Sequence, residues 1–456
     1  MDLSYTRKNI WNVASADKKR QIRETAEAFK SFNDASKTER LCVKELVRRA
    51  EEKGFRNLLH MQDVKPGDRV YYNDNGKLLY LAVAGCKALT EGAALVVSHT
   101  DSPRLDLKIM PLYEEGGFAY LKTSLYGSAK LEKWTSTPLA MFGTVMRIDG
   151  SMVEIAEGQD EEDSVLFITD ASLHYSQEQN ERKQGAAYDQ ERMNLFAASR
   201  AESAEETVKH TVLRYLYEKY GVTEEDLIGA DLEIVPAGRT RDAGFDRSAL
   251  CGYGFDDKAA VFAAMEGIFS CVEPKRTAIA VFCDKEEIGF CGRSGSQSRV
   301  TDYFLRLLAE KSGCAGDGIV LNQIQLNSSL LSLEAVCGFD PNYPESHEKY
   351  NGSLLGHGLQ LMKYASRYGK IRTSEASAEF FSIIKKLFND HGVVWQPFAG
   401  KENFGGFSTV AVDFANMGME TLDAAICVLG AHSTYEFMLK SDLHEACIAC
   451  SVYLNA

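Results

Sequence analysis

Five short stretches of the chain combine acidic or imidazole side chains with glycine and turn-forming residues. Borderline metals such as zinc bind imidazole nitrogen and carboxylate oxygen together, so these residue types suit one shared metal site. Taken together, they resemble the ligand set of a two-metal hydrolase. The stretches are SHTDSP at 98–103, GFDDKAA at 254–260, CDKEEIGFCG at 283–292, SLEAVCGFDPNY at 332–343 and GAHSTYE at 430–436.

His99 and Asp101 stand two residues apart in the first stretch. One ring nitrogen of His99 can bind a metal ion while the Asp101 carboxylate accepts the proton on the other nitrogen, which fixes the tautomer of the ring. The stretch SHTDSP also suits a capped turn after a strand, because Ser, Thr and Asp are good turn formers. His99 is therefore a candidate ligand with Asp101 as its supporting partner, and the turn is the alternative.

The paired carboxylates at 256 and 257 follow a glycine turn. Asp256 suits a bridging role between two ions, because a carboxylate can offer both of its oxygens. Asp257 stands ahead of a helical pattern, where an Asp most often serves as an N-cap. For Asp257, the N-cap and a place in the metal site both stay open.

The Glu pair at 286 and 287 closes an apolar run that indicates a buried strand. Neighbouring side chains at a strand end point to different sides. One Glu can therefore bind metal while the other acts as general base beside a metal-activated water. A solvated acidic turn is the alternative. His432 also follows an apolar run, where a hydrogen-bonded core histidine is the alternative to a ligand.

The candidate site needs elements that bring these residues together. Residues 78–84 (LLYLAVA) and 93–98 (AALVVS) are typical of buried strands, and the second places His99 at its end. A third apolar run, 278–284 (AIAVFCD), stands directly ahead of the Glu pair. Ligands at strand ends are the usual arrangement in α/β proteins. Helical patterns are predicted over 15–54, ending at Gly54 as at a C-cap, and over 257–271 and 377–392.

The pattern changes between 109 and 238. Short alternating strands with glycine turns replace the α/β pattern, and the acidic, Gln-rich stretches 157–163 and 176–193 predict loops. We therefore predict an α/β metallopeptidase fold with a mixed central sheet. Its catalytic domain is discontinuous, over 1–108 and 239–456, and is interrupted by an inserted, mostly β domain over 109–238.

Composition narrows the function classes. A chain of 456 residues exceeds what one core usually organises, so two domains are expected. The net charge is −14, and no stretch concentrates Lys and Arg with aromatic residues, which disfavours binding to nucleic acid or to an anionic membrane. No apolar run reaches the roughly 18 residues that a membrane helix needs, and the N-terminus lacks a signal-peptide pattern. Small or peptide ligands are favoured.

Cysteine usage indicates the compartment. Eleven cysteines without regular spacing predict reduced thiols in a cytoplasmic protein. Cys447 and Cys450 have the spacing of a redox or zinc half-site, but they belong to an apolar helical pattern, ACIACSVYL. Core packing is the favoured interpretation of that pair.

The order of these motifs resembles the M18 family of metallopeptidases, the aspartyl aminopeptidases, over nearly the full chain. The motifs are His-Thr-Asp-Ser-Pro, Asp-Asp-Lys, Glu-Glu-Ile-Gly, Asp-Pro-Asn-Tyr and Ala-His-Ser-x-x-Glu. The resemblance implies a divergent, bacterial-type member in which Glu286 is the general base. It also implies two divalent ions per chain, zinc before cobalt or manganese, with Asp256 bridging them. The implied metal ligands are His99, Asp256, Glu287, Glu334 and His432.

The resemblance extends to the inserted region. Residues 126–145 are similar to the segment that opens the dimerisation domain of the family. The stretch ITDASLHY at 168–175 resembles the one that supplies a histidine across the dimer, which corresponds to His174. The resemblance therefore implies a homodimer that builds a larger homo-oligomer, a dodecamer. The alternative for His174 is an ordinary histidine in a β segment.

The chain also departs from the family pattern. Glu334 stands where relatives usually carry Asp, which lengthens this ligand by one methylene. Asn403 and Phe404 intrude in a glycine-rich stretch, and Phe290 replaces a small residue, so the specificity pocket can differ. An acidic first residue of the substrate would need a local cation. The candidates for that cation are Lys285, Arg293, Arg299 and Lys401.

These observations favour a cytoplasmic, dinuclear-metal aminopeptidase acting on peptide substrates, with an acidic first residue as the family preference. Two other classes stay open. The same metals can serve a hydrolase of N-acyl amino acids or small amides, which would cleave blocked substrates. A catalytically impaired assembly or binding protein on the same fold would follow if Glu334 or the altered glycine-rich stretch has removed activity.

Overall fold

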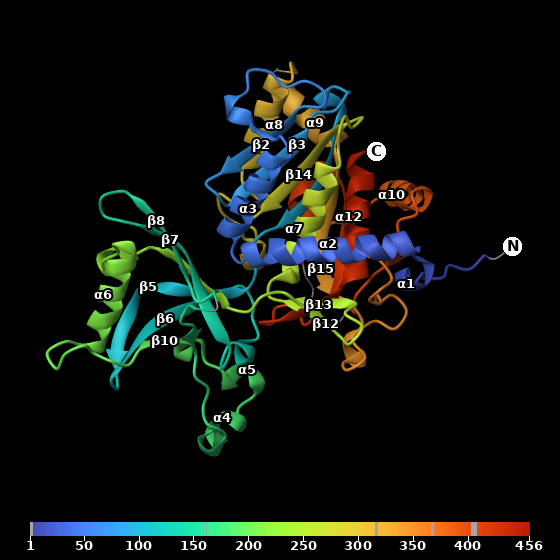
Figure 1. Cartoon of the computed structure of the whole chain (residues 1–456). Coiled ribbons are helices and arrows are strands. Elements are labelled where there is room, and N and C mark those ends of the chain that lie inside the picture. The colour runs from blue at the N-terminus through green and yellow to red at the C-terminus, as the bar shows by residue number, and fades with distance from the viewer. Residues whose placement is uncertain (1–2, 161, 315–317, 366–368, 403–407) are drawn as a thin grey trace. The chain divides into compact units, whose positions relative to one another are not determined.

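The structure is a computed structural model that describes residues 3–160, 162–314, 318–365, 369–402 and 408–456 (Figure 1). The chain forms two compact units. The first comprises Met1–Asp101, Thr240–Ala431 and Tyr435–Ala456, and the second comprises Ser102–Arg239 and His432–Thr434. The first unit is therefore discontinuous along the sequence.

A mixed sheet forms the centre of the first unit, with twelve strands among the described residues. Its middle is parallel, because β4 pairs with β14 on one side and with β15 on the other, and β15 pairs with β18. This confirms the predicted α/β fold with a mixed sheet. The strands in sheet order are β1 (Arg56–Asn57), β2 (Arg69–Asp74), β3 (Leu78–Val83), β14 (Thr277–Cys283), β4 (Ala93–His99), β15 (Ser329–Cys337), β18 (Glu420–Leu429), β19 (Glu436–Leu439), β13 (Ala249–Gly252) and β12 (Arg241–Ala243). In addition, β16 (Leu359–Met362) pairs with β18, and β17 (Trp395–Pro397) pairs with β16.

The central strands are buried on both faces, as their continuous apolar runs predict. Side chains alternate along a strand. On β14, Ala278 and Ala280 belong to one core cluster, whereas Ile279 and Val281 belong to a second. The sheet thus separates two cores.

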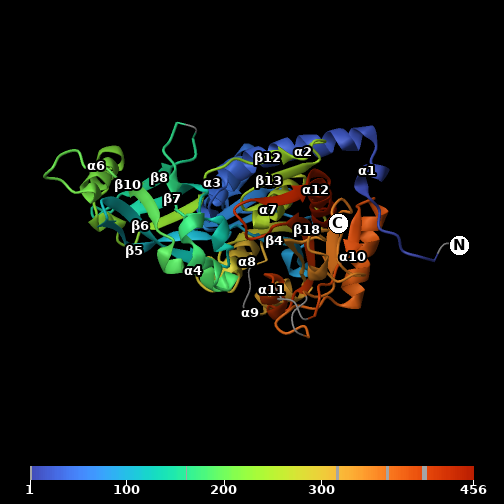
Figure 2. The ribbon, with the colours of Figure 1, turned by 90° about the horizontal axis from the view of Figure 1, so that it is seen from below.

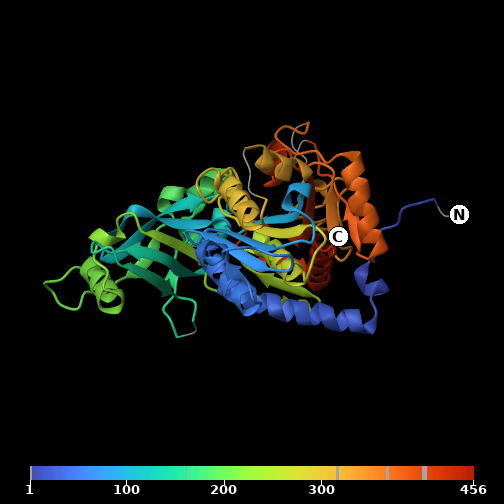
Figure 3. The ribbon, with the colours of Figure 1, turned by 90° about the horizontal axis from the view of Figure 1, so that it is seen from above.

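Helices cover both faces of this sheet. Figure 2 shows β4 and β18 between two helical layers, and Figure 3 shows the same layers from the opposite side. One layer contains α2 (Ala16–Ala35), α3 (Glu39–Glu52), α7 (Phe255–Phe269), α10 (Ala378–Asp390) and α12 (Lys440–Leu454). The other contains α8 (Val300–Lys311), α9 (Gly318–Asn327) and α11 (Ala411–Asn416), and the short α1 (Ile10–Val13) precedes α2.

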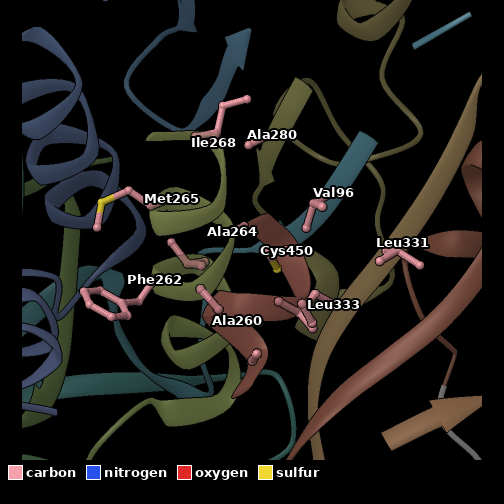
Figure 4. Close-up of a cluster of buried hydrophobic side chains, with 14 of the residues drawn as sticks. Val96, Ala260, Phe262, Ala264, Met265, Ile268, Ala280, Leu331, Leu333 and Cys450 are labelled. Atoms are coloured by element: carbon pink, nitrogen blue, oxygen red, sulfur yellow. The ribbon is translucent and has the colours of Figure 1, made fainter. Parts of the chain in front are cut away.

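The α7 and α12 helices approach each other closely. A Cβ atom at Gly267 would lie 2.5 Å from the Cβ of Cys450, so only glycine fits there. Figure 4 shows Met265 and Ile268 of α7 in the same apolar core as Cys450. Core packing is thus the role of Cys450, and Cys447 packs against the same cluster. All eleven cysteines are free thiols.

The second unit is built mainly from strands. Among its described residues, seven strands form one sheet, and β11 pairs with both β5 and β7, which closes the sheet into a ring. The strands are β5 (Arg104–Glu115), β6 (Phe118–Tyr126), β7 (Pro138–Met146), β8 (Met152–Glu157), β9 (Leu166–Phe167), β10 (Leu195–Ala198) and β11 (Asp231–Pro236).

Strand β5 begins ahead of residue 109, so the strand pairing of this unit starts earlier than the change in sequence pattern. One full helix, α6 (Val208–Tyr220), follows β10, although the pattern of short strands and glycine turns predicts no helix there. The Gln-rich stretch predicted as loop contains only short helical turns, which are α4 (Gln177–Asn180), α5 (Gln184–Ala187) and the 3-10 turn Gln190–Arg192. In the described parts of the chain, no helix is long and apolar enough to cross a membrane.

Candidate metal centre

The candidate site lies where three parallel strands of the first unit end. Along β14 and β4, Cys283 is the register partner of His99, so both strands end at the same level. Along β15 and β4, Ser332 is the partner of Val97, which places Glu334 two residues further on, level with His99. The Glu pair follows Cys283 after two residues. The carboxyl ends of these parallel strands thus gather His99, Glu334 and the Glu pair at one edge of the sheet.

Carboxylates surround the Nε2 atom of His99, whose side chain is 1% exposed. The distance from Nε2 is 3.5 Å to Asp256 Oδ1 and 3.5 Å to Glu334 Oε2. It is 3.9 Å to Glu286 Oε2 and 4.0 Å to Asp257 Oδ2. Four carboxylates from three segments of the chain therefore face one ring nitrogen.

Asp101 supports both sides of this arrangement. Its Oδ1 atom lies 3.2 Å from Nδ1 of His99, as expected of a group that orients the ring. The same carboxylate accepts the backbone N–H groups of Glu286, at 3.2 Å, and of Glu287, at 3.1 Å. The second contact was not foreseen from sequence, because the Glu pair lies far along the chain. One buried carboxylate thus fixes the histidine and the turn that carries the Glu pair.

The Asp257 side chain faces the site and does not cap α7. Its Oδ2 accepts the backbone N–H of His99 at 3.1 Å, and the backbone angles of Asp256 and Asp257 are not helical. Asp257 is fully buried, and its Oδ1 has no hydrogen-bond partner among the described residues. Glu436 holds the neighbouring carboxylate in place, because its Oε2 accepts the N–H of Asp256 at 2.9 Å. In the sequence, the role of Asp257 is signalled only by its position next to Asp256. The role of Glu436 is signalled only by its place as the last residue of the GAHSTYE motif.

The electrostatics of the cluster favour a bound cation. Burial raises the pKa of Asp257 well above its usual value, and burial together with the charges of Glu334 and Glu287 does the same for Glu286. Burial alone would lower the pKa of His99, but the facing carboxylates raise it well above its ordinary value. Several carboxylates cannot all ionise at such short range without a compensating charge.

The donor set fits zinc. The ligand atoms of His99, Glu286 and Glu287 lie within 4.8 Å of one another, and so do those of His99, Asp256 and Asp257. Imidazole nitrogen with carboxylate oxygen is a usual zinc environment. The buried, unpartnered Oδ1 of Asp257 is consistent with a cation nearby. These residues therefore suit divalent metal ions.

Two predicted histidines lie in the second unit. His432 follows β18 by three residues, and its carbonyl accepts the N–H of Lys130 at 3.3 Å. His174 lies in the 3-10 turn Leu173–Tyr175 and is exposed. The metal role of His432 and the catalytic role of His174 stay predictions.

The cations proposed for an acidic substrate side chain mostly have protein partners. Arg293 binds Asp74 through two contacts of 2.8 and 2.9 Å, and Arg299 binds Asp302 at 2.9 Å. The Lys401 ammonium donates to a backbone carbonyl.

Lys285, beside the Glu pair, lies 3.6 Å from the carboxylate of Asp284 and is the candidate nearest the site in sequence. Phe290 packs partly buried against the second core cluster. Asn403 and Phe404 lie outside the described residues.

Comparisons with known proteins agree with this geometry. The sequence model of the family described as "Aminopeptidase I zinc metalloprotease (M18)" matches residues 32–453. A probable M18 family aminopeptidase 1 from Clostridium acetobutylicum is 36% identical over 464 residues, which covers 100% of this chain and 99% of that protein.

Solved structures give the same result. The crystal structure of an M18 aminopeptidase from Thermotoga maritima superposes with a TM-score of 0.95 at 34% identity, covering 99% of this chain and 100% of that chain. The crystal structure of aminopeptidase I from Clostridium acetobutylicum gives a TM-score of 0.93 at 34% identity over the whole of both chains. Because the family model matches nearly the full length of this chain, the chain belongs to the M18 family of zinc metallopeptidases and is a metallo-aminopeptidase.

Proposed function

We propose that the enzyme removes the N-terminal residue of peptides at a centre that holds two divalent ions. The observation that carries the proposal is the ring of four carboxylates around Nε2 of His99. One ion would leave much of this negative charge uncompensated, because like charges at this range oppose one another's ionisation. The residues that would hold the ions are His99, Asp256, Glu287, Glu334 and His432.

The two adjacent glutamates take different roles in this proposal. Bound divalent ions supply Lewis acidity, which polarises the scissile carbonyl and acidifies a water. Glu286 takes the proton of the attacking water and passes it to the leaving amine. Its backbone N–H is fixed by Asp101, which limits how far the carboxylate can move from the site. Glu287 serves as a ligand.

His174 is proposed to act on the site of a neighbouring subunit, where it would stabilise the developing oxyanion. Two observations support a covered position for this turn. Leu173 is 80% exposed and Tyr175 is 89% exposed in the single chain. Two exposed apolar side chains therefore flank His174. Large exposed apolar residues in a group are typical of an interaction surface. A homodimer that builds a larger homo-oligomer would cover them.

The test combines metal analysis with a substrate panel. Protein purified without chelator is analysed for zinc, cobalt and manganese, and activity is measured on fluorogenic aminoacyl substrates with acidic, basic and apolar first residues. We expect about two ions per chain and cleavage that requires a free amino terminus. Cleavage of N-acetylated substrates with no activity on free amines would instead identify an N-acyl amino acid hydrolase. Tight metal binding without any cleavage would identify a non-catalytic assembly protein.

A further inference from the structure

The ligand Glu334 is held on one side by two donors. Its Oε1 accepts the hydroxyl of Ser332 at 3.2 Å and the backbone N–H of Val410 at 3.4 Å. The other oxygen, Oε2, is the one that faces His99 at 3.5 Å. The carboxylate therefore has one anchored oxygen and one oxygen directed to the site.

Behind both donors lies a buried carboxylate that none of the sequence motifs contains. Asp423 is on β18, is 1% exposed, and is the register partner of Ser332 on β15. Its Oδ1 accepts the hydroxyl of Thr409 at 2.6 Å, and Thr409 is the residue directly before Val410. Its Oδ2 accepts the hydroxyl of Ser374 at 3.1 Å.

We propose that Asp423 is a positioning residue for the metal ligand Glu334. By holding Thr409, Asp423 fixes the backbone that presents the Val410 N–H to Oε1 of Glu334. Asp423 also lies opposite Ser332 on the neighbouring strand, where it positions the Ser332 hydroxyl, the second donor. The inference rests on the proposed role of Glu334 as a ligand.

The physical reason lies in the length of the ligand. A glutamate has one more rotatable bond than an aspartate, so more side-chain freedom must be lost when it binds an ion. Groups that orient a ligand typically contribute about 10- to 100-fold to metal affinity. An anchor on Oε1 removes this freedom before the ion arrives. Asp423 does not touch the ion in this arrangement, and its hydrogen bonds act through Thr409, Val410 and Ser332.

The experiment measures zinc affinity of the apo-protein by competition with a chromophoric chelator. Asp423→Asn keeps the side-chain shape but replaces one acceptor oxygen with an NH₂ group, and Thr409→Val removes the hydroxyl. Both variants are expected to weaken the site that contains Glu334 by about tenfold or more. Thr409→Ser keeps the hydroxyl and should bind zinc as the wild type does.

Asp442→Asn is the matched control. Asp442 is also fully buried and accepts two donors, the N–H groups of Gly356 at 2.7 Å and Gly358 at 2.9 Å, but it lies on α12. Burial raises the pKa of Asp423 and of Asp442 to about 7. Asp423→Asn and Asp442→Asn therefore remove similar buried carboxyl groups. Thermal unfolding of each apo-variant measures how much fold stability is lost when a buried carboxylate is replaced.

The outcomes separate this inference from the proposed function. Weaker zinc binding in Asp423→Asn and Thr409→Val, with wild-type affinity in Asp442→Asn and Thr409→Ser, supports it. If Glu334→Gln weakens zinc binding but Asp423→Asn and Thr409→Val bind zinc no more weakly than Asp442→Asn, the positioning role is wrong while the metal site stands. If Glu334→Gln itself binds zinc normally, the assignment of Glu334 as a ligand fails, and the inference fails with it.

Discussion

The strand-end edge of the first unit and the His174 turn of the second unit present their functional groups in opposite ways. At the edge, His99 is 1% exposed and contacts carboxylates from several segments. At the turn, His174 is exposed between Leu173 at 80% and Tyr175 at 89% exposure. The first arrangement brings His99 and its facing carboxylates together within one unit. The second presents its side chains to the exterior.

The difference shows how far each assignment depends on assembly. Side chains at the ends of central strands are fixed by the hydrogen bonds of the sheet and by supporting groups such as Asp101. An exposed histidine on a single 3-10 turn has few such constraints, so it needs a further surface to hold it in a catalytic position. Substitutions at the strand-end edge should therefore change the metal affinity of each chain. Substitutions at the His174 turn should lower activity only in the assembled oligomer.

The largest expected effect is at Asp256. Asp256→Asn should empty both metal positions and reduce activity to the background of the assay, because the proposed bridge between the ions loses its charge. Elemental analysis of protein purified without chelator measures the loss. Asp63→Asn removes an exposed carboxylate and should keep about two ions per chain. Stoichiometric metal in Asp256→Asn would contradict the bridging role.

A second substitution pair tests the difference between the neighbouring glutamates. Glu286→Gln should keep its metal and lower kcat by about 10²-fold or more, since general-base catalysis contributes roughly 10² to 10⁴. Glu287→Gln should instead weaken metal binding itself. Metal content and steady-state kinetics of the two variants are compared side by side. Loss of metal from Glu286→Gln with retention by Glu287→Gln would reverse the two assignments.

The smallest expected effect is at the turn. His174→Ala should leave metal content and oligomer size unchanged and lower kcat more than it raises KM. We expect kcat to fall by about 10²-fold, the lower end of the loss for one oxyanion donor.

Mixing this variant with Glu286→Gln under subunit exchange should restore part of the activity, because a hybrid dimer has one site with both groups intact. Mass analysis verifies the exchange. Hybrids that form without any recovery would show that His174 does not act across subunits.

Local patterns were sufficient for much of the fold. Continuous apolar runs predicted β3, β4 and β14, and the helical pattern over 15–54 gave α2 and α3 with a positive φ at Gly54. Helix α6 was missed because it lies inside a region of short strands and glycine turns, where the alternating pattern dominated. Asp257 illustrates the opposite limit. Local sequence leaves an N-cap and a place in the site both open, whereas the backbone N–H of His99, from a distant strand, binds the side chain in the site.

The sequence by itself determined the kind of chemistry, because imidazole and carboxylate groups at strand ends suit divalent metals whatever the details of packing. Tertiary structure alone decided which supporting groups hold them. Asp101 reaches the Glu pair across 185 residues, and the pairing of β15 with β18 sets Asp423 beside Ser332. Such contacts depend on strand order and register, which bring together residues that no spacing in the chain relates.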